Sequence, residues 1–252
     1  MKNHIHALAL IAMSATCTLA AYAQPTWNVG ETVLNEYDLV SGVNIPWELT
    51  WGPADMLWCT TREGDVLRID PASGAYETVL SQNVNDSGVE PGLLGMALHP
   101  NFELEPLVYL AYTAQTFANG NHERLSVFYW DGTSLGNEQI LHIVGAAGIH
   151  NGSRLLVLPD NTLLMSTGDM GDGGVSSQND NSDNGKILRF NLDGSVPADN
   201  PDPTSYVFTK GHRNSQGLCV GPNGVIYSSE HGQYNSDEFN ILEAGRNYGW
   251  PN

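Results

Sequence analysis

A degenerate internal repeat constrains the fold of this chain more than any other feature. Four times, an apolar run ends at a proline turn with a polar tip, and a second apolar run follows directly. Measured between the turn prolines, the repeats are 47, 59 and 63 residues apart; these prolines are Pro53, Pro100, Pro159 and Pro222. A four-stranded propeller blade takes about 40 to 50 residues, and loop insertions lengthen that period. The repeat therefore predicts a β-propeller.

The remaining pattern is typical of an all-β fold. Short runs rich in Val, Ile, Leu, Tyr and Trp alternate with turns rich in Gly, Asn, Asp and Pro, and helical periodicity is hard to find. We predict about four blades, with residues 66–69 and 186–190 as outer strands of two of them. The alternative is a β-sandwich whose proline turns are alike by coincidence. Residues 169–185 are polar and glycine-rich, so we expect a mobile loop over one face rather than a part of the core.

The N-terminal segment is predicted to be a secretory signal, residues 1–23. Lys2 precedes an apolar stretch, residues 7–20, which ends at a small-x-small site, Ala21-Tyr22-Ala23. A membrane anchor is the alternative, but the stretch is short for a bilayer span and is diluted by serine and threonine. We expect the mature protein to begin at Gln24, to lie in the periplasm or outside the cell, and to have no membrane span.

The net charge argues against nucleic acid and anionic lipid as partners, and the positions of the cysteines argue against a disulfide. The net charge of -18 repels nucleic acid and anionic lipid. Cys59 and Cys219 remain once the signal is removed. We favour two buried free thiols over a disulfide, because the repeat places these residues in distant blades. A bridge needs the two Cα atoms within about 7 Å.

Unusual polar residues stand at the junctions of the predicted strands. His150 precedes the first strand of the third repeat, Arg213 precedes that of the fourth, and His231 follows the second strand of the fourth. Equivalent positions of successive blades converge around the central channel of a propeller. An imidazole can take a proton from a hydroxyl, a guanidinium can stabilise an oxyanion, and bare carbonyls can bind a hard cation. This set could oxidise an alcohol if a hydride acceptor were present. Alternatively, these are turn residues that satisfy backbone groups.

Five ordered blocks of the sequence resemble the soluble quinoprotein glucose and aldose sugar dehydrogenases, which form the glucose/sorbosone dehydrogenase family. The blocks are residues 92–102, 184–201, 211–218, 229–240 and 245–252. The likeness extends from about Pro46 to the last residue. One block alone would be weak, and the order of all five makes the resemblance specific.

The resemblance implies a six-bladed propeller that binds pyrroloquinoline quinone together with calcium. It makes His150 the catalytic base, which removes the proton from the C1 hydroxyl of an aldose sugar while the C1 hydride passes to the quinone and the lactone forms. Arg213 is the second predicted catalytic residue and, with Asn214, contacts the quinone oxygens. The backbone carbonyls of Gly232 and Gln233 are the predicted calcium ligands. An external electron acceptor then takes the electrons.

Three positions depart from the family pattern. Glu90, which we assign to the cofactor-binding set, stands where the glucose-specific members have Gln. Ile149 stands where they have Asp, and Met170 where they have Gln. These changes weigh against a preference for glucose and leave the histidine and arginine of the pattern intact.

The sequence ends where the family has roughly two more blades. In the family those blades supply cationic side chains for the carboxylates of the quinone. The cations available for that role here are Lys210, Arg213 and Arg154. We therefore expect residues 24–252 to be a partial propeller and a fragment of a longer protein. We expect this fragment, by itself, to bind the cofactor weakly. Asp237 and its neighbour Glu238 either support a structural calcium ion or lie in a solvated loop.

A fold does not fix a function, so two other functions remain open beside the aldose sugar dehydrogenase that we favour. One is a non-catalytic propeller that binds a sugar or a protein. The other is a calcium-dependent propeller lactonase.

Overall fold

The structure is a computed structural model that describes residues 26–116, 118 and 120–252. The predicted signal, residues 1–23, lies outside the described residues. The chain divides into two compact units after Asp38. In the first unit, β1 (Thr26–Val29) and β2 (Thr32–Asn35) pair as an antiparallel hairpin. The second unit, Leu39–Asn252, contains all the other elements.

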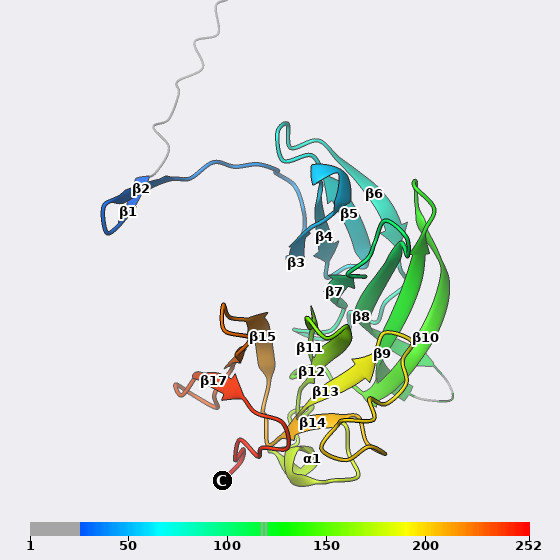
Figure 1. Ribbon diagram of the computed structural model, residues 1–252, viewed down its shortest axis with the longest axis vertical. Helices are drawn as coiled ribbons and strands as arrows, with labels where there is room; N and C mark the ends of the chain where they lie inside the picture. The colour runs from blue at the N-terminus through cyan, green and yellow to red at the C-terminus, as the bar shows by residue number, and fades with distance from the viewer. Residues whose placement is uncertain (1–25, 117, 119) are drawn as a thin grey trace, which may run out of the picture. The chain divides into compact units, whose positions relative to one another are not determined.

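The second unit consists of four antiparallel sheets that follow one another along the chain (Figure 1). Their strands are β3 (Pro46–Trp51), β4 (Leu57–Thr61), β5 (Asp65–Ile69) and β6 (Tyr76–Ser81); β7 (Leu93–Leu98), β8 (Leu107–Thr116), β9 (Gly120–Trp130) and β10 (Leu135–Gly145); β11 (Gly152–Val157), β12 (Thr162–Thr167), β13 (Lys186–Asn191) and β14 (Val207–Lys210); and β15 (Ser215–Val220), β16 (Ile226–Glu230) and β17 (Glu238–Leu242). Within each sheet, consecutive strands are neighbours. The prediction of an all-β propeller with about four blades is confirmed.

The first strands of the four blades, β3, β7, β11 and β15, lie next to one another in that order. Hydrogen bonds join neighbouring blades, for example from Thr60 Oγ1 to the Leu94 carbonyl at 2.6 Å and from Ser166 Oγ to the Ser215 carbonyl at 2.9 Å. The backbones of β7 and β11 approach so closely that a Cβ on Gly95 would lie 1.9 Å from a carbonyl oxygen of β11. These contacts make the first strands the inner strands of the propeller.

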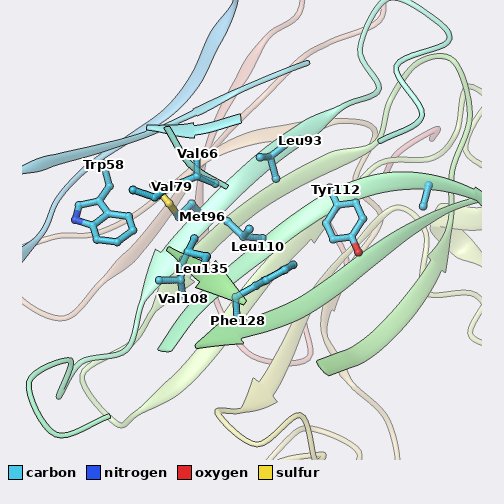
Figure 2. Close-up of a cluster of buried hydrophobic side chains, with 11 residues drawn as sticks. Trp58, Val66, Val79, Leu93, Met96, Val108, Leu110, Tyr112, Phe128 and Leu135 are labelled. Atoms are coloured by element: carbon cyan, nitrogen blue, oxygen red, sulfur yellow. The ribbon is translucent and has the colours of Figure 1, made fainter. Parts of the chain in front are cut away.

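Apolar side chains fill each seam between two blades. The seam between the first and second blades is drawn in Figure 2, where Trp58 and Val66 pack against side chains from β7, β8 and β9. A second cluster joins β8, β9 and β10 to β11, β12 and β13, and a third joins β12 and β13 to Leu242 of the fourth blade. Burial of such side chains is the main favourable term in folding, so the blades stabilise one another in series.

Residues 169–185 correct one expectation, because several of their side chains are packed rather than solvated. The segment includes a single helical turn, α1 (Val175–Gln178), and it buries Asp169, Ser177 and Asn184. Polar groups, rather than apolar ones, hold it in place, which is why a hydropathy pattern did not reveal it. No helix in the described part of the chain is long and apolar enough to cross a bilayer.

Both cysteines are free thiols, as expected from their separation in the repeat. Cys59 is buried on β4, whereas Cys219 is exposed on β15, so the expected burial of Cys219 is wrong. Side chains of β15 alternate in direction, and most of this inner strand is only partly covered within the described residues.

Glu123 on β9 is a buried carboxyl group that forms no ion pair with any described residue. Its side chain is 0% exposed, and neither carboxylate oxygen makes a hydrogen bond within the described residues. Burial raises the pKa of Glu123 from its usual 4.5 to about 8, and the Ser153 hydroxyl opposes this effect only in part. The group is therefore protonated in the folded protein at neutral pH.

We predict that Glu123→Gln removes a pH dependence from the stability of the protein. Between pH 4.5 and about 8 the folded state holds a proton that the unfolded chain has released. The free energy of unfolding therefore falls as the pH rises through this window, by at most about 1.4 kcal/mol per pH unit. Denaturant unfolding at pH 5, 6, 7 and 8 should give a flatter profile for Glu123→Gln, with the variant more stable than the wild type at pH 8.

The matched control for this prediction is Glu77→Gln, which neutralises an exposed glutamate that pairs with Arg68 on the first blade. Its profile should parallel that of the wild type, because exposed ion pairs contribute little. Parallel profiles for the wild type and Glu123→Gln would contradict the prediction.

Candidate active site

The predicted site residues meet because of the way an antiparallel pair is built. The start of an inner strand and the end of the next strand lie at the same end of a blade. His150 lies two residues before β11, and Asp169 lies two residues after β12, so both lie at this end of the third blade. Arg213 and Asn214 immediately precede β15 at the same end of the fourth blade, and Glu90 precedes β7 in the second.

The His150 imidazole is oriented by the Asp169 carboxylate. His150 Nδ1 lies 2.6 Å from Asp169 Oδ1, and the Asp169 side chain is only 1% exposed. The same carboxylate accepts hydrogen bonds from the Gly171 N–H and the Trp250 Nε1–H, each at 2.9 Å. A carboxylate that accepts from these donors also accepts from Nδ1, so the Nδ1 atom of His150 holds the proton. The lone pair is then on Nε2, which has no hydrogen-bond partner among the described residues.

The backbone at His150 is strained. Its φ is 56°, in the left-handed region that non-glycine residues rarely occupy. The Met170 N–H donates to the His150 carbonyl at 3.2 Å, and a Cβ on Gly168 would lie 1.9 Å from that same oxygen. Glycine is therefore required at position 168 for this approach. Strain that surrounding contacts maintain at a reactive side chain is a common property of functional sites.

Glu90 connects the loops of three blades. Its Oε2 accepts from the His150 backbone N–H at 2.6 Å and from Asn214 Nδ2 at 3.2 Å. The side-chain oxygen Oδ1 of Asn214 accepts from the Gly152 N–H and from Gln216 Nε2. Asn214 is only 1% exposed. Its side chain therefore holds these loops together, and the cofactor contacts predicted for Glu90 and Asn214 stay predictions.

Arg213 lies beside the His150–Asp169 pair. The Arg213 carbonyl accepts the Asp169 N–H at 2.8 Å, and the Arg213 guanidinium carbon lies 5.6 Å from the centre of the Trp250 ring. One guanidinium N–H donates to the His231 carbonyl at 3.1 Å, and the other side-chain N–H groups have no partner within the described residues. His231 thus contributes a carbonyl, while its imidazole, 60% exposed, lies 3.9 Å from Asp237.

Two of the three cations that the sequence offered for the quinone are engaged elsewhere. Arg154 forms an ion pair with Glu48 and stacks over the Trp47 ring at 4.0 Å. Lys210 Nζ pairs with Asp180 at 2.6 Å. The interpretation that these two side chains are free for a ligand is therefore wrong. Of the three, only Arg213 has no carboxylate partner among the described residues.

A cavity of about 150 Å³ lies among the inner-strand ends of all four blades. Glu90 forms part of its wall, which places the cavity next to the His150 backbone. It is lined by Ile45, Trp47, Arg62, Val89, Glu90, Leu94, Asn151, Gly152 and Gln216. The sequence analysis did not identify Arg62 as a site residue. Arg62 follows β4 as Asp169 follows β12, and this equivalent position in two blades could have indicated it.

The predicted calcium ligands lie on an exposed turn after β16. The Gly232 N–H donates to Asp237 Oδ1 at 3.0 Å, which closes the turn. The carbonyls of Gly232 and Gln233 accept no hydrogen bond from any described residue, and free carbonyl oxygens are suitable ligands for Ca²⁺. No cluster of three or more histidine, cysteine or acidic side chains occurs in the described ranges. The calcium assignment therefore fits the backbone and stays a prediction.

Fold and site together define a β-propeller with an oriented histidine and a partly free arginine at one end of its inner strands. The family model for glucose/sorbosone dehydrogenase matches residues 43–252. The chain belongs to this family, as the resemblance in the sequence had indicated.

Known proteins with similar sequence or structure support the assignment. Quinoprotein glucose dehydrogenase B of Acinetobacter calcoaceticus is 32% identical over 291 residues, which cover 100% of this chain and 61% of that protein. The pyrroloquinoline-quinone-bound form of aldose sugar dehydrogenase from Streptomyces coelicolor is 36% identical, with a TM-score of 0.79 over 84% of this chain and 64% of that one. Aldose sugar dehydrogenase of Escherichia coli K12 is 27% identical, over 92% of this chain and 66% of that protein. The chain thus spans slightly less than two thirds of each relative.

We predict that Asp169→Asn disturbs the tautomer of His150. An asparagine can offer either its carbonyl or its amide group to Nδ1, so the preference for the proton on Nδ1 is lost. Nitrogen-15 NMR of the histidine side chains should show one tautomer of His150 in the wild type and a mixture in the variant. Asp180→Asn, an exposed change in the same segment, should leave the His150 signal as it is. An unchanged signal in Asp169→Asn would rule out the orienting role.

Proposed function

We propose that the full-length protein is an exported quinoprotein oxidoreductase that oxidises the C1 hydroxyl of an aldose sugar to the lactone. Pyrroloquinoline quinone would accept the C1 hydride, which carries both electrons of the oxidation, and an external acceptor would then take these electrons. The observation that supports this proposal most strongly is the Asp169-oriented imidazole of His150, whose Nε2 has no partner among the described residues. Membership in a family of sugar dehydrogenases adds the reaction class.

The side chains of this site have complementary roles in such a reaction. His150 Nε2 takes the proton from the C1 hydroxyl as the C1–H bond breaks, and Asp169 stabilises the imidazolium that forms. The free guanidinium N–H groups of Arg213 stabilise the negative charge that develops on neighbouring oxygens. When bound, the quinone supplies the two-electron acceptor, and calcium supplies a Lewis acid beside it.

The residues present fit these cofactors. Arg213, with unused donors, would hold quinone oxygens, and the free carbonyls of Gly232 and Gln233 would hold calcium. The Asn214 amide is buried and already bonded to Glu90, Gly152 and Gln216, so its contact with the quinone stays a prediction. Two relatives have names that state the same chemistry, a quinoprotein and a quinone-bound aldose sugar dehydrogenase. The side chain of Ile149, which is 40% exposed beside the base, cannot form a hydrogen bond with a sugar hydroxyl, and this weighs against a preference for glucose.

We predict that His150→Ala strongly lowers the rate of sugar oxidation. General base catalysis contributes about 10²- to 10⁴-fold, so the rate of sugar-dependent dye bleaching by the full-length protein with calcium and quinone should fall by that factor. His99→Gln, at the turn after β7 and thus at the other end of the blade, is the matched control and should keep the wild-type rate. A wild-type protein that bleaches no dye with any aldose would support a binding propeller, and lactone hydrolysis without quinone would support a lactonase.

We also predict that calcium is required at the Gly232 turn. Chelation with EGTA should lower both the affinity for the quinone, followed by its absorbance, and the rate of dye bleaching. Ca²⁺ should restore both quantities, whereas Mg²⁺ should not, because Mg²⁺ demands a stricter geometry and gives up its waters reluctantly. Full quinone binding in excess chelator would count against a metal at this turn.

A further inference from the structure

Lys186, the first residue of β13, has a fully buried ammonium group. Its side chain is 0% exposed, and Nζ donates hydrogen bonds to three backbone carbonyls, those of Ser176 at 2.7 Å, Asn184 at 2.9 Å and Ser177 at 3.2 Å. No carboxylate forms a direct ion pair with Nζ in the described part of the chain. All three acceptors belong to the loop between β12 and β13, the same loop that contains Asp169.

Burial of this ammonium is unfavourable by itself. It lowers the pKa of Lys186 from 10.5 to about 8, although nearby carboxylates, Asp183 first among them, oppose the effect. An apolar side chain of similar length would avoid that cost. It would also remove the one donor that the Asn184 carbonyl has among the described residues, and one of the two donors of each of the Ser176 and Ser177 carbonyls. The arrangement is therefore a cation held in a cage of carbonyls, and the loop depends on that cation for its shape.

The caged loop supports both halves of the candidate site. On one side, the Gly185 N–H donates to the Gly168 carbonyl at 2.9 Å, directly before the aspartate that orients His150. On the other side, the Ser177 carbonyl accepts the Gly211 N–H, and the Ser177 hydroxyl donates to the His212 carbonyl at 2.6 Å. The His212 N–H in turn donates to the Gly185 carbonyl at 3.1 Å.

We propose that Lys186 is the positioning residue of the site. Its buried ammonium group, through three carbonyl contacts, fixes the loop that holds the His150–Asp169 pair and the Arg213 loop in position relative to each other. Lys186 touches neither the imidazole nor the guanidinium, so it acts only through the loop. The catalytic consequence rests on the proposed function, whereas the structural consequence does not.

The experiment compares Lys186→Met, Lys186→Ala and the control Arg246→Met in the full-length protein. Arg246 is exposed and pairs with Glu243 in a surface turn, so its substitution also removes one positive charge and adds an apolar side chain. Hydrogen exchange measured by mass spectrometry should show lost protection in residues 169–185 and 211–214 of both Lys186 variants, with residues 57–69 unchanged. The nitrogen-15 signal of His150 should become a mixture of tautomers, and kcat should fall about 10- to 100-fold with little change in KM.

Chemical rescue of Lys186→Ala distinguishes the effect of the ammonium charge from that of the packing of the side chain. Propylammonium fits the space that Lys186→Ala vacates, so it should restore protection and the His150 signal, whereas sodium chloride of equal ionic strength should not. If Lys186→Met does not fold, refolding of Lys186→Ala with and without propylammonium decides the question. Protection and tautomer signals in Lys186→Met equal to those of Arg246→Met, or no recovery with propylammonium, would overturn the proposal. If these signals shift while the wild type oxidises no sugar, the proposed function fails and the role of Lys186 stands.

Discussion

The Asp169 carboxylate is the contact on which the rest of the site depends. It accepts hydrogen bonds from the imidazole of His150, the indole of Trp250 and the Gly171 backbone. The backbone N–H of Asp169 also donates to the Arg213 carbonyl, so this one residue fixes three other stretches of the chain, at His150, Arg213 and Trp250. Because the carboxylate is buried, these bonds are formed in a low-dielectric environment, where each is stronger than it would be in water.

The propeller could be predicted because its signals are local. A strand, a proline turn and a second strand fall within about 15 residues, and pairing between neighbours in sequence needs no knowledge of the rest of the chain. Because equivalent positions of successive blades converge, the sequence placed His150 and Arg213, each just before an inner strand, at the same end of two blades. In the structure both residues contact the segment at Asp169 and Met170. The same argument, applied to the ends of the second strands, would have placed Asp169 and Arg62 at this end as well.

The interior of the polar loop could not be predicted from sequence. Hydropathy records whether a residue prefers water, and by that measure Lys186 and Glu123 belong on the surface. Their burial depends on what the folded chain places around them, three carbonyls in one case and an apolar seam in the other. Ion pairs are equally non-local. The sequence predicts Arg154 and Lys210 as available cations, whereas the fold pairs them with Glu48 and Asp180. The pairing of charges is a property of the fold, and composition gives only their sum.

That distinction bears on how so acidic a chain could hold an anionic cofactor. The net charge of -18 produces a field that disfavours anions at long range, but salt screens exposed charges beyond about 8 to 10 Å. At the site itself, the guanidinium of Arg213 is held over the Trp250 ring by the His231 carbonyl and keeps unused donors. Directional hydrogen bonds to a charged donor act over about 3 Å, where the distant carboxylates contribute little. Affinity for an anion at this end of the propeller would therefore depend on the cations that the fold leaves without a carboxylate partner. Arg154 and Lys210 are paired with carboxylates, whereas Arg213 and the cavity residue Arg62 have no such partner among the described residues.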